Sequence, residues 1–133
     1  MTQKELIQIY EINKEIRMWE EELESIREEI LKSQKLSGMP FANTNETGDP
    51  TGQYAIKIAE IEKTITQKRL ELLNARAAVI QFINTIDDSL TRMILKYRCL
   101  DCKKWENIAE ILGYERTTVS KKYNDILRNL PKN

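Results

Sequence analysis

The first third of the chain repeats apolar residues at alternating spacings of three and four positions. The repeat consists of Ile9, Ile12, Ile16, Trp19, Leu23, Ile26 and Ile30. Most of the residues between them are Glu, Lys or Arg. This spacing places the apolar side chains on one face of an α-helix, as in a coiled-coil seam, and leaves the charged residues in solvent. The pattern predicts one long helix over residues 2–36.

A second seam of the same kind follows in the middle of the chain and predicts a helix over residues 52–84. Its members are Tyr54, Ile58, Ile61, Ile65, Lys68, Leu72, Ala75, Val79 and Phe82. A single polar residue in such a seam can fix register and oligomeric state. Alternatively, Lys68 extends its stem along the edge of the seam. If the chain folds back at the midpoint of the connecting segment, Lys68 lies near Glu20 and Glu21, with its stem on Trp19.

The segment between the two predicted helices, residues 37–52, ends both of them. It holds three of the four glycines and two of the three prolines in the chain, so neither helix continues through it. Two seams of similar length joined by a flexible segment predict an antiparallel hairpin. Such a hairpin buries little surface alone. Because further apolar residues are present, we expect residues 1–84 to self-associate as a dimer or higher oligomer. These residues are Met18, Trp19, Leu31 and Ile83.

Residues 85–133 predict a second domain built from three shorter helices. Asp87 or Asp88 suits the N-cap of the first. Two amphipathic helices follow over residues 103–112 and 116–130, with a turn at residues 113–115. The sequence therefore predicts an all-α protein, in which a long antiparallel helical hairpin precedes a C-terminal three-helix helix-turn-helix module.

The spacing between Ala109, Gly113 and Val119 is typical of a helix-turn-helix. A small residue such as Ala109 lets two steeply crossing helices approach, and Gly113 tolerates the positive φ that ends the first helix. Val119 starts the predicted buried side of the second helix. That side continues through Tyr123, Ile126, Leu127 and Leu130, and it faces Trp105, Ile108, Ile111 and Leu112.

The polar residues of the second helix fall on its other side and have the chemistry of DNA contacts. Arg suits guanine, Asn suits adenine, Ser and Thr suit either, and Lys suits phosphates. Free amides in the first turn also favour a phosphate. The predicted DNA-binding residues are Arg116, Thr117, Thr118, Ser120, Lys121, Asn124 and Arg128, together with Lys103 and Lys104. The alternative is that any helical hairpin with a glycine turn has this outline.

The charge distribution favours a nucleic-acid partner more than the net charge of zero suggests. Residues 1–84 carry 11 basic and 14 acidic residues, whereas residues 85–133 carry 10 basic and 7 acidic ones. Residues 116–133 contain five basic residues against Asp125 alone. The positive charge is therefore concentrated at the C-terminal end.

The stretch WENIAEILGYERTTVSKKYNDIL, residues 105–127, resembles the region-four helix-turn-helix of bacterial sigma factors. The chain as a whole is similar to small sigma-like phage proteins related to the ArpU and RinA late-gene regulators. Residues 94–114 carry most of this resemblance, and SGMP at residues 37–40 is similar to the family's inter-helix loop. Glu115 departs from the serine typical of the N-cap, and Lys122 departs from the usual apolar residue.

The resemblance implies a phage or prophage transcriptional regulator that binds double-stranded DNA. Its hairpin would dimerise or contact a partner such as RNA polymerase. One alternative is a small terminase, a DNA-packaging recognition subunit that also joins a helix-turn-helix to oligomerising helices. Packaging subunits form large rings, whereas regulators form dimers or tetramers. Another alternative is an interaction protein that has lost DNA binding, which Glu115 near the expected groove favours.

Cys99 and Cys102 form a lone Cys-x-x-Cys. Zinc needs about four ligands, and the chain has no His and no second Cys pair. A redox pair is expected near a βαβ pattern, which the sequence does not show. Two small, partly buried thiols are the favoured interpretation; a disulfide under oxidation and a metal shared between two chains are the alternatives.

The sequence offers no chemistry that predicts an enzyme. It contains no His, no Gly-rich phosphate loop and no convincing nucleophile–base pair, so we expect no catalytic residue and no cofactor. The polar, charged start is unlike a signal peptide. No apolar run approaches the ~20 residues of a membrane-spanning helix. These features predict a cytoplasmic protein without membrane contact.

Overall fold

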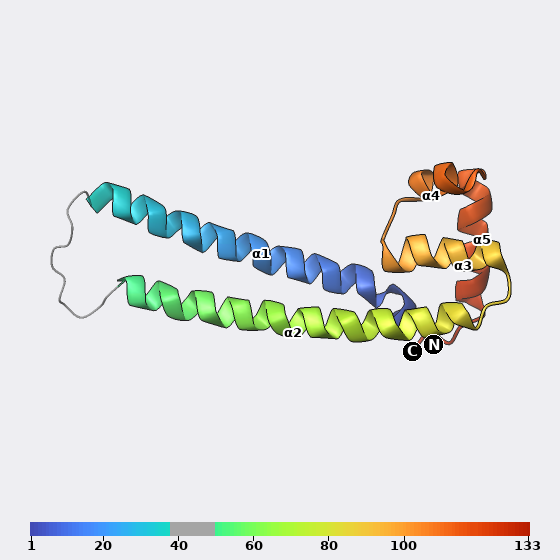
Figure 1. Ribbon diagram of the computed structural model, residues 1–133, viewed down its shortest axis with the longest axis horizontal. Helices are drawn as coiled ribbons and strands as arrows, with labels where there is room; N and C mark the ends of the chain where they lie inside the picture. The colour runs from blue at the N-terminus through green and yellow to red at the C-terminus, as the bar shows by residue number, and fades with distance from the viewer. Residues whose placement is uncertain (38–49) are drawn as a thin grey trace. The chain divides into compact units, whose positions relative to one another are not determined.

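The computed structural model describes residues 1–37 and 50–133, which form helices and no strand (Figure 1). Two long helices come first, and four short helical segments follow them. The elements are α1 (Gln3–Ser37), α2 (Pro50–Asn84), α3 (Ser89–Leu95), the π-helix η1 (Lys96–Leu100), α4 (Trp105–Leu112) and α5 (Arg116–Arg128). The predicted all-α class is confirmed.

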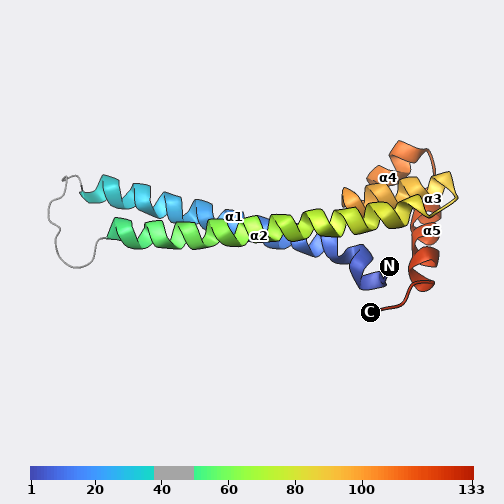
Figure 2. The ribbon, with the colours of Figure 1, turned by 60° about the horizontal axis from the view of Figure 1, so that its bottom comes forward.

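The long helices α1 and α2 pack side by side and run in opposite directions, as both ribbon views show (Figures 1 and 2). Their bounds lie within two residues of the predicted ones. The buried side chains of both helices include the seam residues Ile9, Ile12, Ile16, Ile26, Ile65, Ala75 and Val79. The predicted hairpin is therefore confirmed. Residues 38–49 of the predicted connecting segment lie outside the described residues.

Charged residues between the seam positions keep the long helices polar overall. Although α1 and α2 each contain 35 residues, neither they nor the other described helices have the length and apolar character to cross a membrane.

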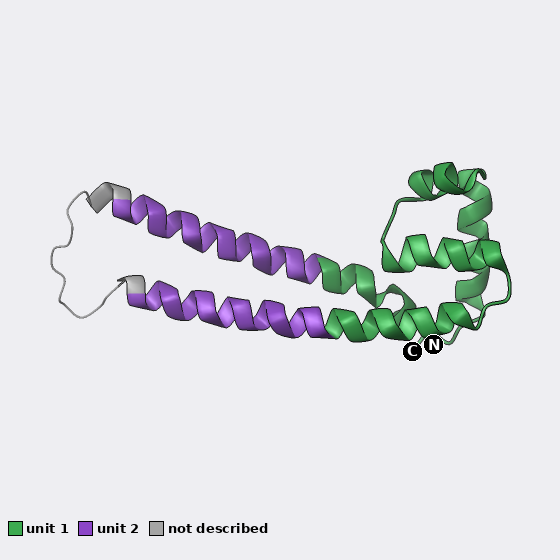
Figure 3. Ribbon diagram, in the orientation of Figure 1, with its two compact units in different colours: residues 1–13, 71–133 green, residues 14–70 purple. Residues whose placement is uncertain are grey.

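Two compact units divide the chain (Figure 3). One, here called the terminal unit, consists of residues 1–13 and 71–133, and the other, the hairpin unit, consists of residues 14–70. The first turns of α1 and the last turns of α2 thus belong with the four short helical segments. This division differs from the boundary at residues 84 and 85 that separates the two predicted functional segments.

Ion pairs flank the seam of the hairpin unit. The Lys68 ammonium lies 3.1 Å from the Glu15 carboxylate, and the Arg69 guanidinium lies 3.0 Å from Glu20. The expected pairing of Lys68 with a glutamate is confirmed; the glutamate is Glu15, while Glu20 pairs with the neighbouring Arg69. The pairs Arg69–Glu20 and Arg27–Glu62 agree with a fold about the midpoint of the connecting segment. Partly exposed pairs of this kind contribute at most about 1 kcal/mol each, so the apolar seam dominates.

The terminal unit has an apolar core to which all five α-helices contribute. Its fully buried side chains include Leu6, Ile9, Val79, Ile94, Leu95, Ile108 and Val119. Ile83 is only 8% exposed, because it lies one turn beyond Val79 on the same face of α2. The expectation that Ile83 adds surface for self-association is therefore wrong. Met18 and Leu31 do remain exposed, and Trp19 is half-buried.

The two chain ends of the terminal unit are joined by hydrogen bonds. The backbone N–H of Gln3 donates to the Pro131 carbonyl at 2.7 Å. The Gln3 side-chain amide donates to the carbonyls of Leu127 and Leu130, at 2.7 and 3.1 Å. The last carbonyls of a helix have no partner within it, so the start of α1 caps the end of α5.

Candidate nucleic-acid interface

Asp88, one of the two residues predicted to cap α3, is its N-cap. The Asp88 carboxylate accepts hydrogen bonds from the Thr91 hydroxyl at 2.6 Å and the Thr91 backbone N–H at 3.2 Å. The Lys122 ammonium donates to the same carboxylate at 2.9 Å. The Thr91 hydroxyl first, and then Lys122, favour the ionised form and lower the pKa of Asp88 to about 2. One side chain thus connects α3 to α5.

Lys122, where the resemblance implies an apolar residue, takes part in an ion pair instead. Lys122 is half-buried and pairs with Asp88, while the neighbouring Tyr123 is only 8% exposed and packs inside. Tyr123, and not Lys122, therefore supplies the packing at this point of α5.

Arg98 of η1 organises the approach to the helix-turn-helix. Its guanidinium donates to the Lys103 carbonyl at 2.8 Å and lies 4.4 Å from the centre of the Trp105 ring. The Trp105 ring in turn meets the Tyr123 ring edge to face, with 5.1 Å between the ring centres. Cation–π and aromatic contacts of this kind stabilise partly buried clusters. The cluster joins η1, α4 and α5.

The turn between α4 and α5 has the predicted glycine geometry. Gly113 has a φ of 74°, in the left-handed region that favours glycine. The backbone N–H groups of Gly113 and Tyr114 both donate to the Ala109 carbonyl, at 2.9 and 3.1 Å. Glu115 is the N-cap of α5, but its side chain makes no capping bond. The chain therefore leaves α4 and enters α5 within three residues.

The inner side of α5 packs against α4 much as the sequence predicts. Val119 and Tyr123 are buried, as are Ile108 and Ala109 of α4. Ile111 is 50% exposed, so its predicted place on the packed face is wrong. Successive residues of a helix are rotated by about 100° around its axis. Ile108 and Ala109 therefore define the buried side of α4, and Ile111 lies outside that side.

The outer face of α5 carries polar residues at helical spacing. Thr117, Lys121, Asn124 and Arg128 follow one another at intervals of four, three and four, and all are exposed. This spacing places them in one stripe, opposite Val119, Tyr123 and Ile126. Arg116 and Thr118 are exposed beside the stripe. We call these six polar residues the outer face of α5.

Ser120, Lys103 and Lys104 lie off this face. Ser120 is half-buried, and its hydroxyl donates to the Thr117 carbonyl at 3.3 Å. Lys103 is half-buried before α4, where its backbone bonds with Tyr97 and Arg98. Lys104 lines a cavity of about 350 Å³ together with Tyr123, on the inner side of α5. The structure thus brings six of the nine predicted residues together on α5.

Weak surface pairs occupy two of the arginines on the outer face. Arg116 lies 3.3 Å from Glu106, and Arg128 lies 3.3 Å from Asp125, with every side chain more than half exposed. Exposed pairs are worth about 0–1 kcal/mol, so a phosphate can replace either acidic partner. α5 carries four basic residues and one acidic residue. The outer face therefore favours anionic partners.

Sequence reasoning missed Gln3 and Arg98, which position α5 at its end and near its middle. Gln3 contacts the other end of the chain, whereas Arg98 contacts the nearby Lys103 and Trp105 and reaches α5 through the Trp105–Tyr123 ring pair. No local motif marks either residue.

Cys99 and Cys102 are free thiols, in line with the favoured interpretation. Burial disfavours the thiolate and raises the pKa of Cys99 to about 12, although a hydrogen bond with Tyr123 opposes this. Cys102 is half-buried with a φ of 54°, and Asn13 donates to its sulfur at 3.8 Å. Among residues 1–37 and 50–133, no group of three or more His, Cys, Asp or Glu side chains could hold a metal ion.

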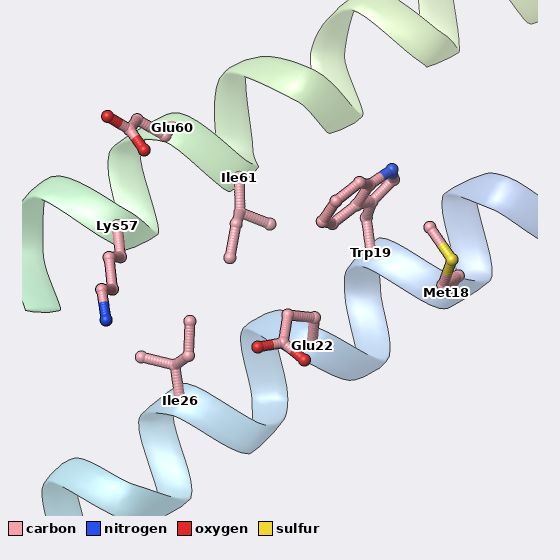
Figure 4. A pocket seen from close by; sticks show the side chains of 7 residues that line it. All are labelled: Met18, Trp19, Glu22, Ile26, Lys57, Glu60 and Ile61. Carbon is pink, nitrogen blue, oxygen red and sulfur yellow. The ribbon is translucent and has the colours of Figure 1, made fainter.

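The hairpin unit contains a second hollow, of about 460 Å³, between α1 and α2. Figure 4 shows Trp19 and Ile26 pointing from α1 toward Ile61 of α2, while Glu60 points away from them. The remaining lining residues are Met18, Glu22 and Lys57. The hollow is an apolar gap in the seam with a charged rim, and its residues do not form a catalytic arrangement.

No protein family, curated protein or solved structure matches the chain. The resemblance to sigma-like phage proteins and the predicted DNA contacts therefore stay predictions.

Proposed function

We propose that the protein binds double-stranded DNA sequence-specifically, with α4 and α5 as its helix-turn-helix and α5 as the recognition helix. The observation that carries the proposal is the outer face of α5. Its exposed polar stripe lies opposite the buried Val119 and Tyr123. A recognition helix needs this division, because one side holds the module together while the other enters the groove.

The dimensions and chemistry of α5 suit the major groove. Its 13 residues span about 20 Å, and the groove is about 12 Å wide and accepts an α-helix. Arg116 and Asn124 have the donors that read guanine and adenine edges, and Lys121 and Arg128 suit phosphates. Thr117 and Thr118 lie in the first turn of the helix, where a free amide favours a phosphate, although the Thr118 N–H already donates to the Glu115 carbonyl at 3.0 Å.

The contacts that hold α5 in place also favour a binding role, because a helix that reads bases must be held in a fixed orientation. Gln3 bonds the carbonyls near its end, and Lys122 pairs with Asp88 of the α3 cap. Tyr123 packs against Trp105 near the middle. None of these three contacts uses the outer face.

We further propose that the protein is a phage or prophage transcriptional regulator, since the resemblance of residues 105–127 to sigma region four favours transcription. In this proposal the hairpin dimerises the protein or contacts a partner such as RNA polymerase. The protein acts in the cytoplasm, without a cofactor and without enzymatic activity.

The first test is in-vitro selection of bound sequences from random DNA duplexes, followed by titration of the enriched duplex at two salt concentrations. We expect an enriched motif and a salt-dependent affinity. A Lys121→Ala/Arg128→Ala variant should bind more weakly. The charge-matched control Lys14→Ala/Arg17→Ala, on α1, should bind like the natural protein.

Light scattering on the selected complex distinguishes the alternatives. A dimer or tetramer on the enriched motif supports the regulator, whereas a ring of about eight or more chains supports a packaging subunit. Failure to enrich any sequence, even at low salt, would overturn the proposal and leave an interaction protein.

A further inference from the structure

A second apolar stripe runs along α2, away from the seam with α1. Leu70, Leu73, Ala77 and Ile80 follow one another at intervals of three, four and three on one uninterrupted helix. Leu70, Leu73 and Ile80 are 58%, 62% and 43% exposed. Heptad spacing of exposed apolar residues is the pattern by which one helix packs against another. The seam residues Leu72, Ala75 and Val79 lie on a different side of the helix.

This side of α2 presents almost no charge. Residues 72–86 contain one charged residue, Arg76, although 32% of the chain is charged. The Arg76 guanidinium is turned toward the Leu100 carbonyl, to which it donates at 2.8 Å. Asn74 and Gln81 are exposed next to the stripe. The centres of protein interfaces are depleted in charge in the same way.

We propose that this surface pairs with the same surface of a second copy of the chain. We call it the lateral face of α2; it comprises Leu70, Leu73, Asn74, Ala77, Ile80 and Gln81. In a two-fold contact each residue of one copy meets a residue of the same face on the other copy, so a charge of one sign would need an opposite charge within that face. The lateral face presents apolar side chains and amides instead. The amide side chains of Asn74 and Gln81 both donate and accept hydrogen bonds, and this makes the face complementary to itself.

The order of large and small residues favours an antiparallel pair. In a parallel pair Ala77 would face Ala77 of the second copy and leave a gap, which close packing disfavours. In an antiparallel pair centred near Ala75, Leu73 faces Ala77 of the second copy, and Leu70 faces its Ile80. Each of the four layers then contains at least one large side chain. The Asn74 side chains of the two copies meet beside the axis.

The inference deepens the proposed function and rests on it for the choice of partner, because two-fold DNA readers bind paired half-sites. The contact itself does not require DNA. The two ideas can therefore fail separately.

The test is the oligomeric state of the full chain without DNA, measured by analytical ultracentrifugation across a dilution series. We expect a monomer–dimer equilibrium. Leu73→Glu should raise the dimer dissociation constant at least about tenfold. Ile56→Glu is the matched control, because Ile56 is as exposed as Leu73, at 62%, but lies near the start of α2 and outside the lateral face. Glu and Leu have similar helix propensities, and circular dichroism would verify that both variants fold.

Orientation is tested by disulfide trapping in a Cys99→Ala/Cys102→Ala background. Asn74→Cys should cross-link two copies, whereas Gln67→Cys, on the same side of α2 but far from the axis, should not. A chain that stays monomeric at every concentration would overturn the inference, as would equal weakening by Leu73→Glu and Ile56→Glu. Efficient cross-linking through Gln67→Cys alone would overturn the antiparallel register.

Titration of the same variants with random duplex at low salt keeps the two proposals distinct. A dimer that binds no duplex leaves the lateral face intact and defeats the DNA-binding proposal. A monomer that binds an enriched duplex supports the DNA-binding proposal and overturns the pairing of the lateral face.

Discussion

The Lys122 ammonium and the Thr91 hydroxyl donate to the same oxygen of the Asp88 carboxylate, at 2.9 and 2.6 Å. Asp88 therefore caps α3 and holds α5 with one side chain. Asp88 belongs to the cap of α3 and does not lie on the outer face of α5. The orientation of α5, the proposed recognition helix, therefore depends on a carboxylate outside that helix.

This relationship predicts a loss of stability in acid. Contacts in the folded protein lower the pKa of Asp88 from 3.8 to about 2, so the unfolded chain binds more protons between these values. The stabilisation is fully present above pH 3.8 and is lost as the pH falls toward 2. Urea denaturation at a series of pH values should show this slope, and Asp88→Asn should reduce it. The control Asp87→Asn removes the same charge one residue earlier; an equal effect of the two variants would contradict the assignment.

Gly113 provides a test of the turn that is free of steric effects. A Cβ added there would meet nothing within 4 Å, so only the positive φ of 74° opposes a side chain. We expect Gly113→Ala to lower the free energy of unfolding by about 1–2 kcal/mol. Gly113→Asn should cost less, because Asn visits the left-handed region more readily. Urea denaturation measures the stability of both variants, from the shift of the midpoint at an unchanged dependence on denaturant. An alanine variant as stable as the natural protein would show that the turn does not need this φ.

Ile108 and Ile111 provide a matched pair on α4, since Ile108 is 0% exposed and Ile111 is 50% exposed. We expect Ile108→Ala to lower the free energy of unfolding by about 2–5 kcal/mol. Ile111→Ala should cost much less, because little of that side chain is removed from water. Similar losses for the two variants would show that Ile111 packs on the inner side of α4, as its sequence pattern first suggested.

The features predicted correctly from the sequence are those encoded by local spacing. Three-four repeats identify both long helices and their shared seam. Asp88 marks the start of α3 because its carboxylate accepts hydrogen bonds at the N-cap. Gly113 marks the end of α4 because glycine tolerates a positive φ. Residue type and helical period alone also identify the polar side of α5.

The features that the sequence did not predict depend on contacts between distant segments. The pairing of Lys68 with Glu15 depends on side-chain conformations across the seam, which the heptad pattern does not specify. Ile83 and Ile111 are both apolar residues near a seam, yet one is buried and the other exposed. The role of Gln3 arises only once the two chain ends meet, and that of Arg98 once η1 and α4 pack together.

The two thiols should differ in reactivity. Cys99 is 5% exposed, and its pKa is raised to about 12, so almost none of it is thiolate at neutral pH. Cys102 is half-buried and more accessible. We expect iodoacetamide to label Cys102 first and Cys99 only after unfolding. Mass spectrometry of timed digests would measure both rates, with Cys102→Ala as the control. Equal labelling rates in the folded protein would contradict the burial of Cys99.

Substitutions on the outer face of α5 should separate base reading from phosphate binding. Asn124→Ala should weaken binding to the selected duplex by ~1–3 kcal/mol while leaving random duplex little changed, because a base-edge contact is lost. Arg116→Ala should behave similarly once Arg116 exchanges Glu106 for a base. Lys121→Ala should instead weaken both duplexes alike and reduce the salt dependence.

Fluorescence anisotropy with the selected and random duplexes at several salt concentrations would distinguish these outcomes. Asn107→Ala is the matched control, because Asn107 is also an exposed asparagine but lies on α4. Equal losses on both duplexes for Asn124→Ala would refute its role as a base reader, since a contact that ignores sequence belongs to the DNA backbone.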